Sequence, residues 1–161
     1  MPSLTALLAD EADTLALGQA LARILQPGLV LHLHGELGAG KTCLTRALLH
    51  AAGYVGRVKS PTYTLMEPYT ISLEGQSIAL LHFDLYRMGN PREFIEAGFR
   101  DQFDGSAICI VEWPEQAANL LPPPDLDLTL TVTGHSRKVE LLAKSEQGMA
   151  CLHQLQFNPH Q

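Results

Sequence analysis

The segment from Gly35 to Thr42 reads Gly-Glu-Leu-Gly-Ala-Gly-Lys-Thr and matches the pattern G-x-x-x-x-G-K-[ST] in full. It follows the apolar run 29–34 directly and leads into a helix-forming segment, 41–52. A strand, a glycine-rich loop and a helix in this order gather backbone N–H groups at the positive end of a helix, where phosphate binds. The order therefore predicts a nucleotide phosphate loop. In such a loop Lys41 lies near the outer phosphates, and the hydroxyl of Thr42 can reach a magnesium ion.

The size and charge of the chain limit what else it can be. With 161 residues, of which 46% are hydrophobic, residues 1–161 are expected to form a single domain with a sizeable core. A net charge of −6 argues against a protein that grips nucleic acid by itself, so any link to RNA would pass through another subunit. The sequence has neither a basic-then-apolar signal nor an apolar run near the ~18 residues of a membrane span, which predicts a cytoplasmic chain without membrane contact.

Hydrophobic periodicity and turn residues predict the remaining elements. In chain order they are a helix over 10–25, a hairpin of strands 64–71 and 77–83, a helix over 91–103, a buried strand over 107–111, and an antiparallel pair over 126–132 and 138–142. A hairpin requires antiparallel pairing, so an α/β fold with a mixed parallel/antiparallel sheet is expected. The last stretch, 146–161, gives no clear pattern and is expected to fray.

Two acidic residues end apolar runs. Asp84 follows 78–83 and Glu112 follows 107–111. A phosphate-loop enzyme needs an acid at the carboxyl end of a buried strand, where it can hold magnesium opposite the hydroxyl of the loop. The two acids are therefore predicted to act as a functional pair. The residues alone leave open which acid contacts the metal and which orients the attacking water.

Four other features are interpreted from the residues, and only the first of them leaves two alternatives open. The hydroxyl-rich stretch 60–64 is either an ordinary turn or a switch that approaches magnesium and the terminal phosphate. Trp113 is taken as a core or rim aromatic, and Cys43 as a reduced packing residue. The histidines at positions 32, 34 and 82 lack zinc-like spacing, so they are interpreted as strand residues near a polar rim, and no metal site other than magnesium is predicted.

Four ordered blocks together resemble the TsaE (YjeE) family, bacterial ATPases needed to make threonylcarbamoyladenosine in tRNA. The blocks are Gly35 to Thr42, Ser60-Pro61-Thr62-Tyr63-Thr64-Leu65, His82-Phe83-Asp84-Leu85-Tyr86-Arg87 and Val111-Glu112-Trp113-Pro114. The resemblance extends from about Glu11 to Arg137. It implies a P-loop NTPase-like three-layer fold that binds ATP and Mg²⁺.

The resemblance also implies roles for single residues. Lys41, Asp84 and Glu112 are the implied catalytic residues, with Thr42 and Glu112 as magnesium ligands and Asp84 near the terminal phosphate. The implied nucleotide-binding residues are Glu11, Gly38, Ala39, Gly40, Lys41, Thr42, Asp84 and Arg137.

The family acts with the TsaB and TsaD proteins, of which TsaD transfers the threonylcarbamoyl group while TsaE hydrolyses ATP to keep the complex turning over. Two alternatives share the phosphate loop. A small-molecule kinase of this size usually carries an arginine-rich lid, but after Arg100 only Arg137 remains. A GTPase or nucleotide-gated binding module is the other alternative, although the guanine-reading motif N-K-x-D is missing from the sequence.

Overall fold

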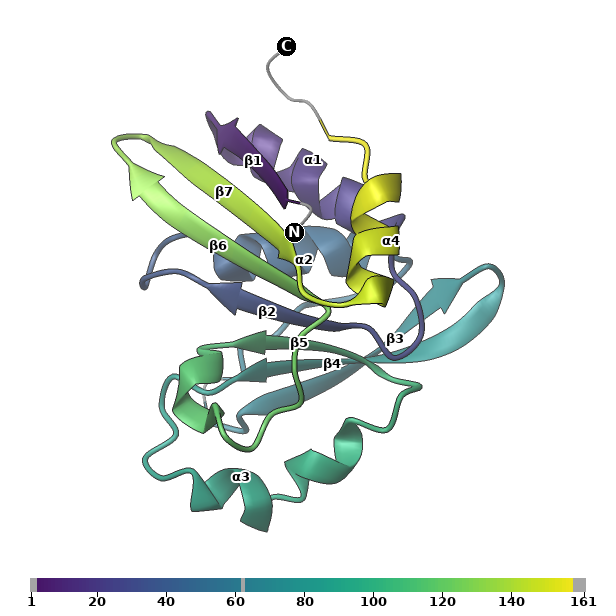
Figure 1. Ribbon diagram of the computed structural model, residues 1–161, viewed down its shortest axis with the longest axis vertical. Coiled ribbons are helices and arrows are strands. Elements are labelled where there is room, and N and C mark those ends of the chain that lie inside the picture. The colour runs from purple at the N-terminus through teal and green to yellow at the C-terminus, as the bar shows by residue number, and fades with distance from the viewer. Residues whose placement is uncertain (1–2, 62, 158–161) are drawn as a thin grey trace.

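The computed structural model describes residues 3–61 and 63–157, and its centre is a seven-stranded sheet (Figure 1). The strands are β1 (Ser3–Leu8), β2 (Val30–His34), β3 (Met66–Leu73), β4 (Gln76–Asp84), β5 (Ile108–Glu112), β6 (Leu126–Thr133) and β7 (Ser136–Ala143). Their order in the sheet is β1-β7-β6-β2-β5-β4-β3. Strands β6, β2, β5 and β4 pair in parallel, whereas the pairs β1–β7, β6–β7 and β3–β4 are antiparallel. The predicted mixed sheet is confirmed.

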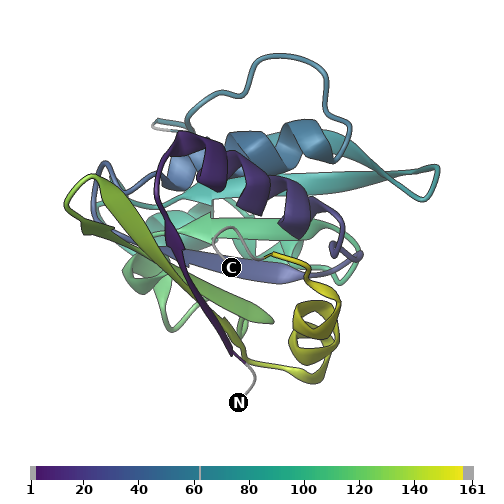
Figure 2. The ribbon, with the colours of Figure 1, turned by 90° about the horizontal axis from the view of Figure 1, so that it is seen from above.

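Helices lie on both faces of this sheet. They are α1 (Glu11–Ala22), α2 (Lys41–Ala51), α3 (Arg92–Glu96), the 3-10 helices η1 (Phe99–Gln102) and η2 (Pro114–Ala117), and α4 (Glu146–Gln154). Figure 2 shows α1 and α2 side by side over one face of the sheet. Successive side chains of β5 alternate between two cores: Ile108 and Ile110 join the core under α1 and α2, while Cys109 and Val111 join the core that includes Phe94 of α3. The arrangement is the three-layer P-loop NTPase-like fold expected.

The structure differs from the sequence-based expectations in three places. Strand β1, which was not predicted, pairs with β7 and covers what would otherwise be an exposed edge. The helix predicted over 91–103 is interrupted at Gly98, whose left-handed backbone (φ 74°) separates α3 from η1. The expected fraying after residue 146 is wrong for α4, because Ser145 caps the helix and Cys151 packs into the core.

Among the helices of the described residues, none combines the length and the apolar character needed to span a bilayer.

Candidate functional site

The loop between β2 and α2 has the backbone that its glycines allow. Gly38 and Gly40 have positive φ angles, 82° and 105°, a region that residues with a side chain rarely adopt. Gly40 is also the residue that precedes α2, and within the described chain no side chain caps this helix. The first N–H groups of α2 therefore remain available to an external acceptor, and the helix dipole favours an anion there.

Lys41 begins α2 and is only 5% exposed. Its Nζ donates a hydrogen bond to the backbone carbonyl of Gly35 and lies 3.9 Å from the ring centroid of Trp113, close enough for a cation–π interaction. Burial lowers the pKa of Lys41, while the carboxylates of Glu112 and Asp84 oppose this shift. The side chain is therefore held in one place at the edge of the loop.

Trp113 sits directly after β5 in a left-handed conformation (φ 57°, ψ 49°), which is unusual for a residue with a large side chain. Its ring packs between Lys41 and Tyr86, with 4.9 Å between the Trp113 and Tyr86 ring centroids. The interpretation of Trp113 as a rim aromatic is confirmed, because the ring lines a hollow beside the loop.

The two acidic residues, Asp84 and Glu112, lie next to each other, as was predicted from their positions at the ends of two strands. β4 and β5 are parallel neighbours, and Asp84 is directly opposite Glu112 in their register. Glu112 is 2% exposed, whereas Asp84 is half-buried and accepts a 3.1 Å hydrogen bond from the backbone N–H of Tyr86. Burial raises the pKa of Asp84, and the neighbouring charge of Glu112 raises it further.

His82 belongs to this acid pair, although the sequence analysis placed it near a polar rim. That interpretation is wrong: His82 is 1% exposed, and its Nε2 lies 2.5 Å from Oε2 of Glu112. A carboxylate accepts, so Nε2 carries the proton and the imidazole holds Glu112 in position. Its Nδ1 has no hydrogen-bond partner among the described residues. The sequence signal that could have revealed this role of His82 is the position of the residue, two before Asp84 and on the same face of the strand.

Two hollows meet at Gly40 and Cys43 and contain every site residue predicted from the sequence. The acid-side hollow has a volume of about 400 Å³, and its lining includes Gly38, Gly40, Lys41, Thr42, Asp84 and Glu112. The α1-side hollow has a volume of about 270 Å³, and its lining includes Glu11, Ala39, Gly40 and Arg137. Residues from α1, the loop, β4, β5 and β7 therefore line two adjoining hollows at the N-terminus of α2, which are together called the recess.

Arg137 contacts the loop itself. Its Nε donates to the carbonyl of Ala39 at 3.1 Å and its Nη2 to the carbonyl of Gly38 at 3.3 Å. On the other side, the Sγ of Cys43 is 3.8 Å from Oε1 of Glu11. Cys43 is half-buried and lines both hollows, so the interpretation as a packing residue missed its position in the recess.

The hydroxyl-rich stretch 60–64 reaches the recess at one end. Ser60 lines the acid-side hollow, whereas the hydroxyl of Thr64 donates to Glu67 at 3.3 Å. Thr62 lies outside the described residues. The stretch does form a turn at residues 63 and 64, where the N–H of Leu65 donates to the carbonyl of Pro61 at 3.0 Å, and the switch interpretation stays a prediction.

The raised pKa of Asp84 predicts that this residue lowers the stability of the free protein. The folded state holds a proton on Asp84 up to a higher pH than the unfolded chain does, so the free energy of unfolding falls as pH rises between the two pKa values. Asp84→Asn removes this penalty and keeps the acceptor for Tyr86. We expect it to raise the Tm at pH 7 without nucleotide, by roughly 2–4 °C per kcal/mol gained.

Thermal unfolding followed by circular dichroism measures this effect. The gain should shrink toward pH 3, below the ordinary aspartate pKa of about 3.9. Asp104→Asn is the control of opposite sign, because backbone N–H groups of the following residues, Ser106 first, hold the pKa of Asp104 below its ordinary value. A lower Tm for Asp84→Asn at pH 7 would contradict the prediction.

Comparison with known proteins places the chain among related sequences. Residues 8–139 match the model of the family described as threonylcarbamoyl adenosine biosynthesis protein TsaE. The tRNA threonylcarbamoyladenosine biosynthesis protein TsaE of Haemophilus influenzae is 41% identical over 153 residues, covering 92% of this chain and 94% of the relative. The TsaE protein of Bacillus subtilis is 32% identical over 126 residues, covering 78% of this chain and 76% of that relative. The crystal structure of Bacillus subtilis YdiB superposes with a TM-score of 0.75 and 26% identity, covering 96% of this chain and 94% of that one.

Proposed function

Because the chain belongs to the TsaE family of tRNA threonylcarbamoyladenosine biosynthesis proteins, we propose that it is a magnesium-dependent ATPase that drives turnover of a TsaB–TsaD threonylcarbamoyl-transfer complex. The observation that carries the proposal is the meeting of the buried Lys41 with Asp84 and Glu112 at the uncapped N-terminus of α2. One buried cation, two carboxylates and open backbone N–H groups suit the phosphates of a nucleotide and their metal ion.

The magnesium ion would be held by the hydroxyl of Thr42 and the carboxylate of Glu112. His82 occupies one oxygen of that carboxylate, which leaves the other as a ligand. Oxygen ligands are those that Mg²⁺ prefers, and the bound ion would neutralise charge on the transferring phosphoryl group. Lys41 would add a positive charge at the outer phosphates. Asp84, which is less buried than Glu112, would orient the attacking water.

The rest of the nucleotide would occupy the α1-side hollow. Gly38, Ala39 and Gly40 would wrap the phosphate chain with their backbone, while Glu11 and Arg137 line the space beyond it. The bonds from Arg137 to two loop carbonyls support a second role, since they connect β7 to the loop conformation.

The proposed partners rest on the net charge of the chain and on its family. Its net charge of −6 disfavours a direct grip on tRNA, so the tRNA would be held by the transfer complex and contacted only indirectly. Hydrolysis by the solitary protein is expected to be slow, because the stretch around Ser60 would need a partner to hold it in a reactive arrangement.

Trp113 offers a direct readout of nucleotide binding. It is the only tryptophan in the chain, and its ring lies on Lys41 at the acid-side hollow. We expect ATP with Mg²⁺ to change its fluorescence emission, because a charged ligand next to the ring alters the polarity around it. Titration with a matched Trp113→Phe variant as the blank measures the change. Unchanged emission, with binding confirmed by calorimetry, would separate Trp113 from the nucleotide.

Steady-state release of phosphate tests the proposal as a whole. Three samples would be compared at saturating ATP and Mg²⁺. They are the protein alone, the protein with the purified TsaB–TsaD complex, and the complex alone. We expect slow hydrolysis by the protein alone and at least a several-fold stimulation by the complex. Transfer of the terminal phosphate to a small metabolite would instead favour a kinase, and an absence of any hydrolysis with the complex would contradict the proposal.

A further inference from the structure

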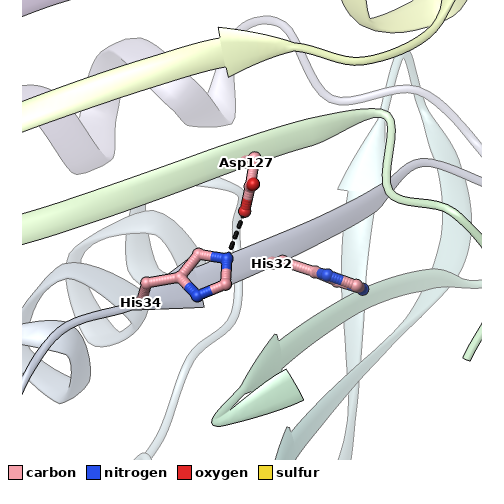
Figure 3. A group of neighbouring side chains, drawn as sticks. All are labelled: His32, His34 and Asp127. Atoms are coloured by element: carbon pink, nitrogen blue, oxygen red, sulfur yellow. Dashed lines mark hydrogen bonds and ion pairs between the residues drawn. The ribbon is translucent and has the colours of Figure 1, made fainter. Parts of the chain in front are cut away.

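A second group of polar side chains lies on the sheet face opposite α1 and α2, outside the nucleotide recess. His32 and His34 lie on the same face of β2, two residues apart, and Asp127 of β6 is directly opposite His32 in the parallel register. Figure 3 shows His32 and His34 on β2 and Asp127 on the neighbouring β6, with Asp127 pointing toward His34. The nitrogen and oxygen atoms that each could offer to a metal ion lie within 4.8 Å of one another.

His32 is the member of this group that lacks a partner. It is 8% exposed, and its Nε2 has no hydrogen-bond partner among the residues that the structure describes. Buried polar atoms in folded proteins are nearly always satisfied, so an orphaned ring nitrogen indicates a ligand or an ordered solvent molecule.

His34 already has an acidic partner on each side. Its Nε2 is hydrogen-bonded to Oδ1 of Asp127, and its Nδ1 lies 3.8 Å from Oε2 of Glu115 on η2. Glu115 is exposed and lines the same open cleft, which has a volume of about 590 Å³. Lys144 also lines this cleft, but the carboxylates of Asp127 and Glu115 outnumber its single positive charge. The site is therefore reachable from solvent and negative on balance.

We propose that His32, His34 and Asp127 bind a divalent transition-metal ion of the zinc type, with solvent from the open cleft completing its coordination. Two imidazoles and a carboxylate form a donor set that suits Zn²⁺ or Co²⁺ better than Mg²⁺, which prefers oxygen alone. Ligands around a tetrahedral zinc ion at bonds of about 2.1 Å are roughly 3.4 Å apart, so modest side-chain rotations would close the present arrangement.

The site is separate from the nucleotide recess. None of its three side chains is among the residues proposed to hold ATP or magnesium, although β2 leads from His34 directly into the phosphate loop. A bound ion would connect β2 and β6, two strands that are distant in the chain. Because an unfolded chain does not preform such a site, binding is expected to stabilise the folded protein.

Metal titration of the untagged chain, stripped with a chelator and free of nucleotide, tests this site. We expect each chain to bind one Co²⁺ ion, with visible absorption bands typical of low-symmetry coordination. Calorimetry should show that each chain binds one Zn²⁺ ion. His34→Gln and Asp127→Asn should each weaken Zn²⁺ binding at least tenfold, while His153→Gln, an exposed histidine on α4, should leave it unchanged. Zn²⁺ should raise the Tm of the parent chain and not of the two site variants.

These variants keep the proposal falsifiable. His34 and Asp127 are 33% and 23% exposed at their side chains, so their replacement opens no sealed cavity, whereas His32→Gln is informative only if its melting curve remains cooperative. Binding of Zn²⁺ that is equally strong in all variants, or no stoichiometric binding at all, would overturn the proposal. The group would then be a His–Asp hydrogen bond beside a buried histidine.

Discussion

Lys41→Ala is expected to abolish ATP hydrolysis, with a loss in kcat on the order of 100-fold or more. The substitution removes the one buried cation at the loop, which is held by the carbonyl of Gly35 and the ring of Trp113. Charge that develops on the outer phosphates in the transition state would then lack its fixed counterpart. ATP binding should weaken as well, because part of this interaction already exists in the ground state. Phosphate release and calorimetry measure the two effects.

The fold is expected to survive this change, because Lys41 faces a hollow at the start of a helix and its burial is a cost rather than a gain. Lys138→Ala is a suitable control: Lys138 is exposed, and its contact with Glu140 at 3.6 Å is a surface ion pair. A Lys41→Ala protein that unfolds, or one that hydrolyses ATP at the parent rate, would defeat the assignment of the loop.

Glu112→Gln and Asp84→Asn are expected to impair different steps, magnesium-dependent ATP binding and hydrolysis respectively. Glu112 is nearly inaccessible and fixed by His82, as suits a ligand that holds magnesium before the reaction. Its replacement should weaken magnesium-dependent ATP binding by tenfold or more. Asp84 is more exposed and bonded only through one oxygen to Tyr86, so its replacement should mainly lower kcat, because a group that orients water acts in the transition state.

Magnesium titrations at fixed ATP, followed by single-turnover hydrolysis, separate the two roles. His82→Gln adds a third comparison, because loss of the positioning imidazole should reproduce a weaker form of the Glu112→Gln defect and leave the Asp84-dependent step intact. If Asp84→Asn impairs magnesium-dependent binding more than Glu112→Gln does, the two roles assigned here are interchanged.

The sequence predicts most of the fold because its signals are local. The phosphate loop identifies the strand before it and the helix after it, and turn residues identify the two antiparallel pairs. Strand β1 escaped prediction because its stability comes from pairing with β7, more than 120 positions along the chain, as the partners Ser3 and Leu142 illustrate. Helix α4 escaped because its nine residues carry few apolar side chains and rely on the cap at Ser145 and on packing.

Most of the recess was predictable because its residues belong to the phosphate loop or end a strand, whereas Glu11 and Arg137 were predicted from the family resemblance alone. All of these residues line the two adjoining hollows, and their roles in binding and hydrolysis stay predictions. Contacts between residues on different strands were not predicted: His82 meets Glu112 across 30 positions, and His34 meets Asp127 across 93. No spacing rule applies to such pairs, and only the position of His82, two residues before Asp84 on the same strand face, pointed toward the acid pair.

Repeated modification of tRNA by the reconstituted system is the most direct test of the central claim. The transfer complex would be supplied with an excess of tRNA and the threonylcarbamoyl donor, together with either the parent protein or its Lys41→Ala variant, and threonylcarbamoyladenosine would be counted per complex. We predict many turnovers with the parent protein and at most about one with the variant, because in the proposed function ATP hydrolysis resets the complex. Full multiple-turnover modification with Lys41→Ala would contradict the account.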